Sequence, residues 1–282
     1  MWTTLITAEE LARAIDDCVV VDCRHDLFDT DAGRRAYLQS HIPGAFFLHM
    51  DEDLSGPKTG RNGRHPLPDR DALRARLAAL GLSDARQLIA YDASGGQMAA
   101  RLWWLARWLG HERVAVLDGD LSAWTAAGYP LSSQLPAPPA PGRLSERAPL
   151  ASAFDAESVA AGLRDGTALV VDARAPERYE GKTEPIDPVA GHIPGAVNRF
   201  NRENLRPDGR FKPAPVLRAE FETLLRGRPP SQVVHQCGSG VAACHSLLAM
   251  EHAGLHGASL YAGSWSEWIA DPQRPIATGP QP

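Results

Sequence analysis

Cysteine is scarce in this sequence, and long apolar runs are missing. Only four of the 282 residues are cysteines, and they form neither a Cys-x-x-Cys pair nor a Cys/His spacing typical of zinc. We therefore expect no disulfide framework, no bound metal and a reducing, cytoplasmic compartment. No stretch reaches the ~18 consecutive apolar residues of a membrane helix. The N-terminus lacks a basic region followed by an apolar core, so we expect no secretory signal.

Lysine is also scarce, and the overall charge is acidic. Three lysines accompany 26 arginines (29 − 3), and the formal net charge is −5. Proteins that bind nucleic acid usually carry a basic stripe or patch, so this balance argues against such a partner. Hydrophobic residues make up 44% and charged residues 22%, as in a soluble globular protein, and the chain is long enough for one large or two ordinary domains.

The sequence does contain a duplication. Four segments of the first half recur in the second half in the same order, at offsets of 150, 151, 145 and 144 residues. The matched pairs are 19–24 with 169–174, 41–45 with 192–196, 88–92 with 233–237 and 119–124 with 263–268. Chance does not preserve order over four such matches. The sequence therefore predicts two copies of one domain rather than a short-period solenoid.

A proline-rich segment separates the two copies. Four prolines fall within residues 134–142, which favours an extended linker. We predict an N-terminal domain at 1–133, a linker at 134–150 and a C-terminal domain at 151–282.

Each half alternates short apolar runs with amphipathic stretches. The runs 19–22 and 169–172 show no polar alternation, which predicts strands of a parallel sheet covered on both faces. Helices are predicted at 72–80, 98–109, 221–226 and 241–252. The predicted fold class is α/β, with two tandem domains that each contain a mostly parallel sheet flanked by helices.

Residues 233–243 carry the clearest chemical signal. An apolar strand ends at Cys237, a short turn with two glycines follows, and small helix-compatible residues come next. In such a turn the loop N–H groups and the positive end of the helix point at the sulfur. Both stabilise negative charge there, which a nucleophilic cysteine needs.

These features resemble the two-domain rhodanese family of sulfurtransferases over nearly the whole chain. The resemblance rests on both His-Ile-Pro-Gly-Ala turns, both Asp-x-Arg strand ends, the paired tryptophan motifs, and the loop Cys-Gly-Ser-Gly-Val at 237–241. That neutral loop is similar to the 3-mercaptopyruvate sulfurtransferase branch, whereas the thiosulfate branch typically carries cations in it. At Ala242 the family commonly has threonine.

The resemblance implies sulfur transfer without a cofactor. The Cys237 thiolate takes sulfur from a donor, becomes a persulfide, and passes the outer sulfur to a thiol or to cyanide. Gly238 and Gly240 would permit the unusual backbone angles of an anion-binding loop, and Val241 and Ala242 would line it with them. The implied acceptor is a thioredoxin-like protein or a low-molecular-weight thiol.

The family also suggests a donor-binding arginine, which would be Arg178. Its guanidinium suits a carboxylate or a sulfonate. The mercaptopyruvate branch usually has a second such arginine further on, but residues 182–188 contain none. Arg174 recurs as Arg24 in the first copy, so we expect a structural ion pair for it.

A proton-transfer group has been proposed for the branch, and by position it would comprise Asp51, His65 and Ser239. A departing enolate or sulfur needs such a donor. The stretch 55–60 is inserted between Asp51 and His65 relative to the family. His41 and His192 occupy identical turns in both copies, which favours a structural role for them.

The first copy is expected to be catalytically silent. It has Asp92 where the second has Cys237, and Phe28 where the second has Arg178. Three functions stay open for the second copy: a 3-mercaptopyruvate or a thiosulfate sulfurtransferase, or a persulfide carrier fed by a partner protein. A cysteine phosphatase would need an arginine at position 243, which is alanine.

Overall fold

The structure, a computed structural model, describes residues 1–282 and divides into two compact units. The first consists of Met1–Gly56, Leu67–Leu150 and Arg206–Phe211, and the second of Pro57–Pro66, Ala151–Leu205 and Lys212–Pro282. Pro57–Pro66, from the first half of the chain, thus belongs to the second unit, and Arg206–Phe211, from the second half, belongs to the first unit. The linear boundaries at 133 and 151 stay a prediction.

The first unit is built on a five-stranded parallel sheet. Its strand order is β1-β5-β4-β2-β3, comprising β1 (Leu5–Ile6), β5 (Val114–Leu117), β4 (Gln87–Tyr91), β2 (Cys18–Asp22) and β3 (Phe46–Phe47). Every residue of β2 and β4 is buried, as expected for strands covered on both faces.

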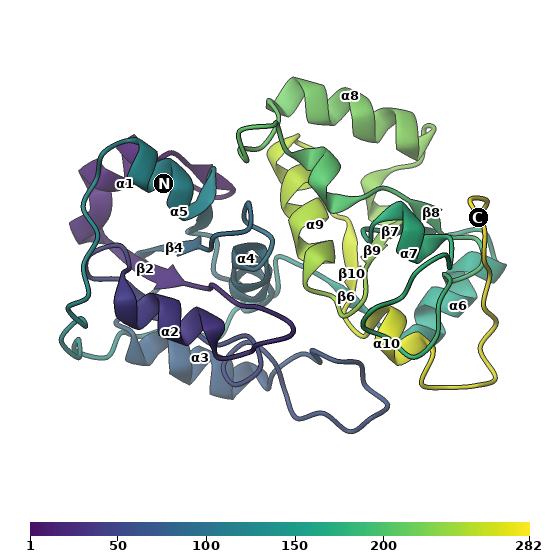
Figure 1. Cartoon of the computed structure of the whole chain (residues 1–282), viewed down its shortest axis with the longest axis horizontal. Coiled ribbons are helices and arrows are strands. Elements are labelled where there is room, and N and C mark those ends of the chain that lie inside the picture. Colours follow the sequence, from purple (N-terminus) through teal and green to yellow (C-terminus); the bar gives the residue numbers. More distant parts are fainter. The chain divides into compact units, whose positions relative to one another are not determined.

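Five α-helices and a short 3-10 turn cover this sheet. They are α1 (Ala8–Ala14), η1 (Ile15–Asp17), α2 (Ala32–Gln39), α3 (Arg70–Ala79), α4 (Ala99–Trp108) and α5 (Asp120–Ala126). Local sequence fixes several ends: Thr7 and Glu10 form a capping box on α1, and the Asp69 carboxylate caps α3. Helices α1 and α5 lie side by side (Figure 1) and share a core with the strands through Leu11 and Trp124.

The second unit repeats this architecture. Its sheet order is β6-β10-β9-β7-β8, comprising β6 (Ala153–Phe154), β10 (Ser259–Tyr261), β9 (Val233–Gln236), β7 (Leu169–Asp172) and β8 (Val197–Asn198), again all parallel. The helices are α6 (Ala156–Arg164), α7 (Pro176–Tyr179), α8 (Ala214–Leu225), α9 (Ala242–His252) and α10 (Ser264–Trp268), with 3-10 turns η2 (Asn201–Asn204) and η3 (Pro230–Gln232). The predicted pair of α/β domains with parallel sheets is confirmed.

One helix prediction was wrong at its start. The pattern suggested a helix at 221–226, but α8 runs from Ala214 to Leu225. Pro213 precedes the helix and Pro215 lies in its first turn, where a missing N–H is tolerated. These prolines concealed the first two turns of the helix.

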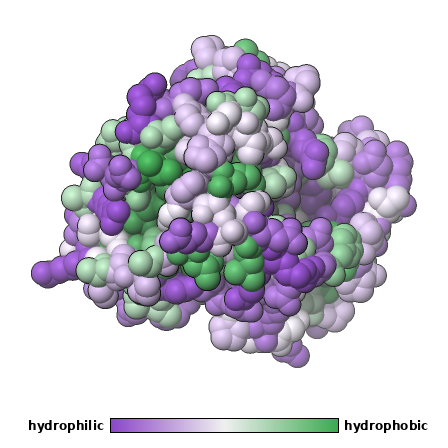
Figure 2. All heavy atoms as spheres, turned by 60° about the vertical axis from the view of Figure 1, so that its left-hand side comes forward, coloured by the Kyte–Doolittle hydropathy of each residue, from purple (hydrophilic) through white to green (hydrophobic).

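Hydrophilic and hydrophobic residues are mixed on the surface of the protein (Figure 2). On the face drawn in Figure 2, hydrophilic residues cover much of the surface and hydrophobic residues lie among them in small groups. None of the helices combines the length and apolar character that a membrane crossing requires.

Candidate active site

Cys237 lies where the sequence predicted, in the loop between β9 and α9. Its side chain is buried, and the Gly240 N–H donates a hydrogen bond to Sγ at 3.2 Å. The Cys237 backbone is fixed on both sides, because its N–H donates to Ser264 Oγ at 3.1 Å and its carbonyl accepts from the Trp265 N–H at 3.0 Å. The sulfur therefore sits in a rigid loop at the carboxyl edge of the sheet.

The two loop glycines serve different purposes. Gly240 has φ +77°, and a Cβ atom there would lie 2.3 Å from the Ala262 carbonyl oxygen, so both conformation and space require glycine. Gly238 was expected to need an unusual backbone angle too, but its φ is not positive. A Cβ atom on Gly238 would instead lie 2.9 Å from Arg64 Nη2 and 3.4 Å from Arg178 Nη2. Gly238 leaves room for guanidinium groups.

The first unit shows what this loop does with an anion. Asp92 follows β4 at the position that matches Cys237, and its buried carboxylate accepts four backbone hydrogen bonds. The donors are the N–H groups of Ser94 (2.9 Å), Gly96 (2.9 Å), Met98 (2.7 Å) and Ala99 (3.0 Å). Gly95 has φ +72°, close to the +77° of its counterpart Gly240. The duplicated loop thus directs its backbone N–H groups at a carboxylate in the first unit, as an anion-binding turn does.

His65 and Ser239 are brought together although 174 residues separate them. His65 Nδ1 lies 2.8 Å from Ser239 Oγ, and both side chains are buried. His65 belongs to the segment Pro57–Pro66, which is part of the second unit. Residues 57–66 therefore pack beside the loop that holds Cys237.

Asp51 belongs to the first unit, so its pairing with His65 stays a prediction. Its carboxylate lies within 4.8 Å of ring nitrogens of His25 and His49, a group that could hold a metal ion. The ring of His49 is already engaged, because Nδ1 accepts from the Asp51 N–H at 3.1 Å and Nε2 lies 2.9 Å from the Thr30 carbonyl. A metal would have to displace these bonds.

Arg178 lies beside the loop, held by two carboxylates. Its Nε and Nη2 donate to Glu184 at 3.1 and 2.6 Å, and Nη2 also reaches Asp187 at 3.2 Å. Burial alone would raise the pKa of Glu184. Hydrogen bonds from Arg178 and from the Asp187 and Ile186 N–H groups outweigh burial and hold that pKa below its ordinary value.

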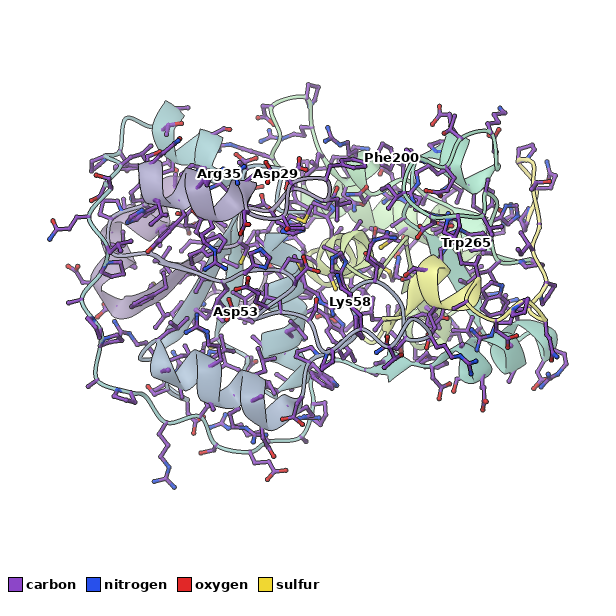
Figure 3. All side chains as sticks on the ribbon, turned by 60° about the horizontal axis from the view of Figure 1, so that its bottom comes forward. Asp29, Arg35, Asp53, Lys58, Phe200 and Trp265 are labelled. Atoms are coloured by element: carbon purple, nitrogen blue, oxygen red, sulfur yellow. The ribbon has the colours of Figure 1, made fainter.

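Arg64 is a site residue that the sequence reasoning missed. Its guanidinium forms a salt bridge with the buried carboxylate of Asp187, and its backbone N–H donates to Ser266 Oγ at 3.0 Å. Gly63 before it approaches the backbone of Gly263 so closely that a Cβ atom would lie 2.6 Å from the Gly263 oxygen. The segment with Lys58 and helix α10 with Trp265 can be followed in Figure 3. The only sequence signal was an arginine directly before His65.

Arg174 has the structural role that its repetition predicted. Its side chain is buried, and its Nη2 donates hydrogen bonds to Asp172 at 2.6 Å and to the Gly191 carbonyl at 2.7 Å. Arg24 makes the matching bonds to Asp22 and to the Ser40 carbonyl, both at 2.6 Å.

The two turn histidines are also structural. His41 Nδ1 lies 2.7 Å from the Tyr37 carbonyl, and His192 Nδ1 lies 2.8 Å from the Tyr179 carbonyl. Each ring also stacks on the tyrosine it contacts.

The remaining predicted residues lie at the start of α9. Val241 is the residue before the helix and Ala242 is its first residue.

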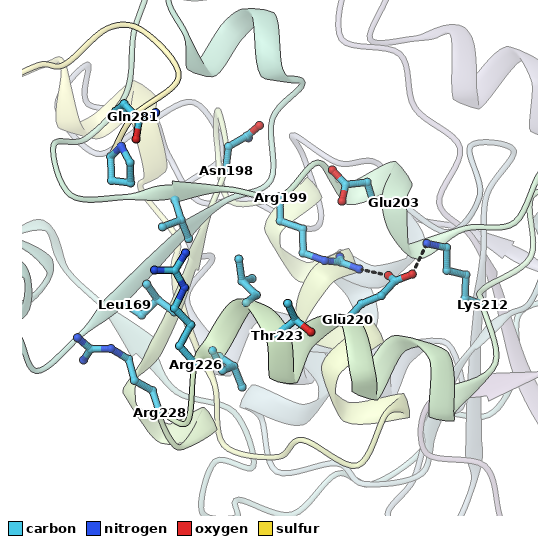
Figure 4. Close-up of a pocket in the computed structure, with 14 residues that line it drawn as sticks. Leu169, Asn198, Arg199, Glu203, Lys212, Glu220, Thr223, Arg226, Arg228 and Gln281 are labelled. Carbon is cyan, nitrogen blue, oxygen red and sulfur yellow. Dashed lines mark hydrogen bonds and ion pairs between the residues drawn. The ribbon is translucent and has the colours of Figure 1, made fainter.

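A separate cavity of about 780 Å³ opens between α8 and the edge of the second sheet (Figure 4). Four cations line it; Arg199 and Lys212 are paired with Glu220, at 2.9 and 2.6 Å, and the other two are Arg226 and Arg228. Cys237 does not line this cavity.

Known proteins share both the sequence and the fold. The rhodanese-like domain family matches residues 7–127 and 155–271. A Pseudomonas aeruginosa protein named a probable 3-mercaptopyruvate sulfurtransferase is 48% identical, with 98% of each chain covered. The thiosulfate sulfurtransferase of Bos taurus is 32% identical, with 89% of this chain and 85% of the relative covered.

A solved structure agrees with these matches. SseA from Escherichia coli, described as a 3-mercaptopyruvate sulfotransferase, superposes with a TM-score of 0.80 at 29% identity, over 94% of this chain and 99% of that one. With both copies of the domain matched and a relative at 48% identity, this chain belongs to the rhodanese-like family.

Proposed function

We propose that this protein is a sulfurtransferase that carries sulfur as a persulfide on Cys237, with 3-mercaptopyruvate as its preferred donor. The observation that supports this most is the loop itself. It holds a buried sulfur against a backbone N–H in the second unit, and its duplicate gathers four N–H groups on a carboxylate in the first. Such a loop stabilises an anionic sulfur without a metal.

The reaction has two halves. The Cys237 thiolate attacks the sulfur of 3-mercaptopyruvate, the S–S bond forms, and the carbon–sulfur bond breaks with its electron pair going to carbon. The resulting enolate of pyruvate takes up the proton that the donor thiol gives up. An acceptor thiolate then attacks the outer sulfur of the persulfide and releases the Cys237 thiolate, in a ping-pong cycle.

The pair His65 and Ser239 is our candidate for that proton transfer. The two atoms are 2.8 Å apart, within the range for general acid–base exchange, and burial keeps bulk water from competing. We propose Asp51 as the residue that would orient His65.

The donor preference rests on the charge of the loop. Gly238 and Ser239 are neutral, so the loop offers less stabilisation to the thiosulfate dianion than a loop with lysine or arginine would. The 48% identical relative is named for 3-mercaptopyruvate, whereas the bovine relative is named for thiosulfate. Thiosulfate is therefore the second candidate donor, and a carrier fed by a partner protein is the third possibility.

The other parts of the proposal follow from the chemistry. The acceptor is a thiol, of a thioredoxin-like protein or of a small molecule, and the compartment is a reducing cytoplasm because Cys237 can attack only in its reduced form. We propose that the first unit does not turn over. Asp92 cannot form a persulfide, and Phe28, which matches Arg178, is 77% exposed and carries no charge.

Initial rates of sulfur transfer to cyanide with each donor, together with the intact mass after exposure to donor alone, test this proposal. We expect faster turnover with 3-mercaptopyruvate and one added sulfur atom per chain. Cys237→Ser should abolish both. Cys244→Ser is the matched control, because its hydroxyl can keep the hydrogen bond to the Gly240 carbonyl. Loading that survives in Cys237→Ser would overturn the proposal.

A further inference from the structure

Two guanidinium groups face the catalytic loop at Gly238, but they are not equally engaged. Arginine presents its Nε–H and one Nη–H as a parallel pair that matches the two oxygens of a carboxylate. In Arg178 this pair, Nε and Nη2, is filled by Glu184 at 3.1 and 2.6 Å. The arginine that the family pattern suggests for donor binding thus has its best edge occupied by the protein itself.

In Arg64 no protein group pairs with the same edge. Its salt bridge to Asp187 uses Nη1, on the other side of the guanidinium. Its Nε is buried and has no hydrogen-bond partner, and its Nη2 lies 2.9 Å from where a Cβ atom of Gly238 would be. A buried donor without a hydrogen-bond partner costs free energy unless a ligand pairs with it.

The segment around Arg64 is held in a way that directs this edge. The Arg64 N–H bonds to Ser266, the close approach of Gly63 and Gly263 fixes the backbone, and Asp187 holds the guanidinium from the far side. Asp187 also accepts from Arg178 at 3.2 Å, so one carboxylate aligns both arginines.

We propose that the Nε/Nη2 edge of Arg64 binds the carboxylate of the sulfur donor, and that Asp187 and Arg178 position it. This inference rests on the proposed function. Arg64 therefore supplies, from residues 57–66, the second arginine that residues 182–188 lack.

The local charges extend the inference to specificity. Arg64 and Arg178 contribute two positive charges, and Glu184 and Asp187 contribute two negative ones, so this group is neutral before a ligand binds. The carboxylate of a monoanionic 2-oxo acid would pair with this unpaired edge and add one negative charge. Thiosulfate would add two charges to the same neutral group, which a low-dielectric site disfavours. The arrangement selects donors that are carboxylate monoanions.

Steady-state kinetics of Arg64 variants test the assignment. Arg64→Gln should raise the KM for 3-mercaptopyruvate about 10- to 100-fold with a smaller change in kcat, the size expected for a lost charged hydrogen-bonded pair. Arg64→Lys keeps the charge and loses the parallel donors, so its KM should lie between those of the wild type and the Gln variant. Arg61→Gln is the control, because Arg61 is exposed in the same segment.

A chemical probe makes the test independent of sulfur transfer. Iodoacetate and iodoacetamide alkylate a cysteine alike, but only iodoacetate carries a carboxylate. In Arg64→Gln the ratio of their second-order rate constants at Cys237 should fall about tenfold towards the neutral reagent, and in Arg61→Gln it should not change. If Arg64→Gln fails to fold by circular dichroism, Arg64→Lys provides the same comparison.

The outcomes separate the two proposals. An unchanged KM and an unchanged alkylation ratio in folded Arg64 variants would overturn the role of Arg64 while leaving sulfur transfer intact. If the wild type loads no sulfur from any donor but the alkylation ratio still depends on Arg64, sulfur transfer is wrong and the carboxylate site stands.

Discussion

Replacing Asp92 tests whether the duplicated loop needs an anion at its centre. Asp92 is fully buried, and its two carboxylate oxygens accept the N–H groups of Ser94, Gly96, Met98 and Ala99. Asp92→Ala removes the acceptor and leaves these four N–H groups directed at an empty space. Since the first unit has no nucleophile here, the change probes stability and leaves the reacting groups untouched.

The expected cost follows from the number of donors that lose their partner. Each buried polar group left unsatisfied costs about 1–3 kcal/mol, so four N–H groups set an upper limit of roughly 12 kcal/mol. Water that enters the vacated space and relaxation of the loop recover part of this cost. We expect a decrease of about 3–5 kcal/mol in the free energy of unfolding, as when one member of a buried charged pair is removed.

Urea unfolding followed by far-UV circular dichroism measures the loss, and hydrogen exchange localises it. The amides of 94–99 should exchange faster in Asp92→Ala, while those of 239–244 should not change. Cys237→Ala is the matched variant, because Sγ accepts only the Gly240 N–H among the described bonds, and it should cost less than Asp92→Ala. Equal, small losses in both variants with unchanged exchange would refute the idea of an anion-binding loop.

Two further predictions concern the second unit. Gly240→Ala places a Cβ atom on a residue with left-handed backbone angles, 2.3 Å from the Ala262 oxygen. It should lower the free energy of unfolding by about 1–3 kcal/mol and reduce persulfide loading. Loading at the wild-type level would contradict this prediction. Burial, with a smaller effect of Arg199, lowers the pKa of His235 to about 3, so the folded state resists a proton that the unfolded state takes up below pH ~6.5. Stability is therefore lost as the pH falls from ~6.5 towards 3, by about 2 kcal/mol between pH 7 and 5 from this group, and urea unfolding at both pH values should show a shallower loss in His235→Gln. An equal loss in the variant would exclude His235 as the cause.

Most of the fold could be predicted from the sequence because the patterns that indicate strands and turns are local and occur in both halves. Unbroken apolar runs predicted strands in both halves, and β7 has the predicted bounds. Cys237 was recognisable because strand, glycine turn and helix follow one another within a few residues. The first turns of α8 were missed because prolines at 213 and 215 resemble a loop, although a helix accepts proline in its first turn.

The site was harder to predict where contacts span long distances along the chain. The family pattern was enough to suggest His65 with Ser239. No local pattern indicated that Arg64 would meet Asp187, 123 residues away, or that Glu184 would fill the donor edge of Arg178. The family pattern places a second arginine after Arg178 along the chain, whereas the fold brings the guanidinium of Arg64 there from residues 57–66.

If the second unit carries sulfur on Cys237 as proposed, the comparison of Asp92 with Cys237 explains why one loop suits both units. An aspartate oxygen and the outer sulfur of a cysteine persulfide are both three bonds from Cα. A persulfide on Cys237 would therefore reach as many bonds into the loop as the Asp92 carboxylate does in the first unit. The conserved turn geometry, with φ +72° at Gly95 and +77° at Gly240, gives both loops a similar backbone. The first unit satisfies its N–H groups with the Asp92 carboxylate, whereas in the second the side chain reaches the same number of bonds only when Cys237 carries a second sulfur atom. Backbone N–H groups at equivalent positions would therefore stabilise the folded loop in the first unit and the persulfide intermediate in the second.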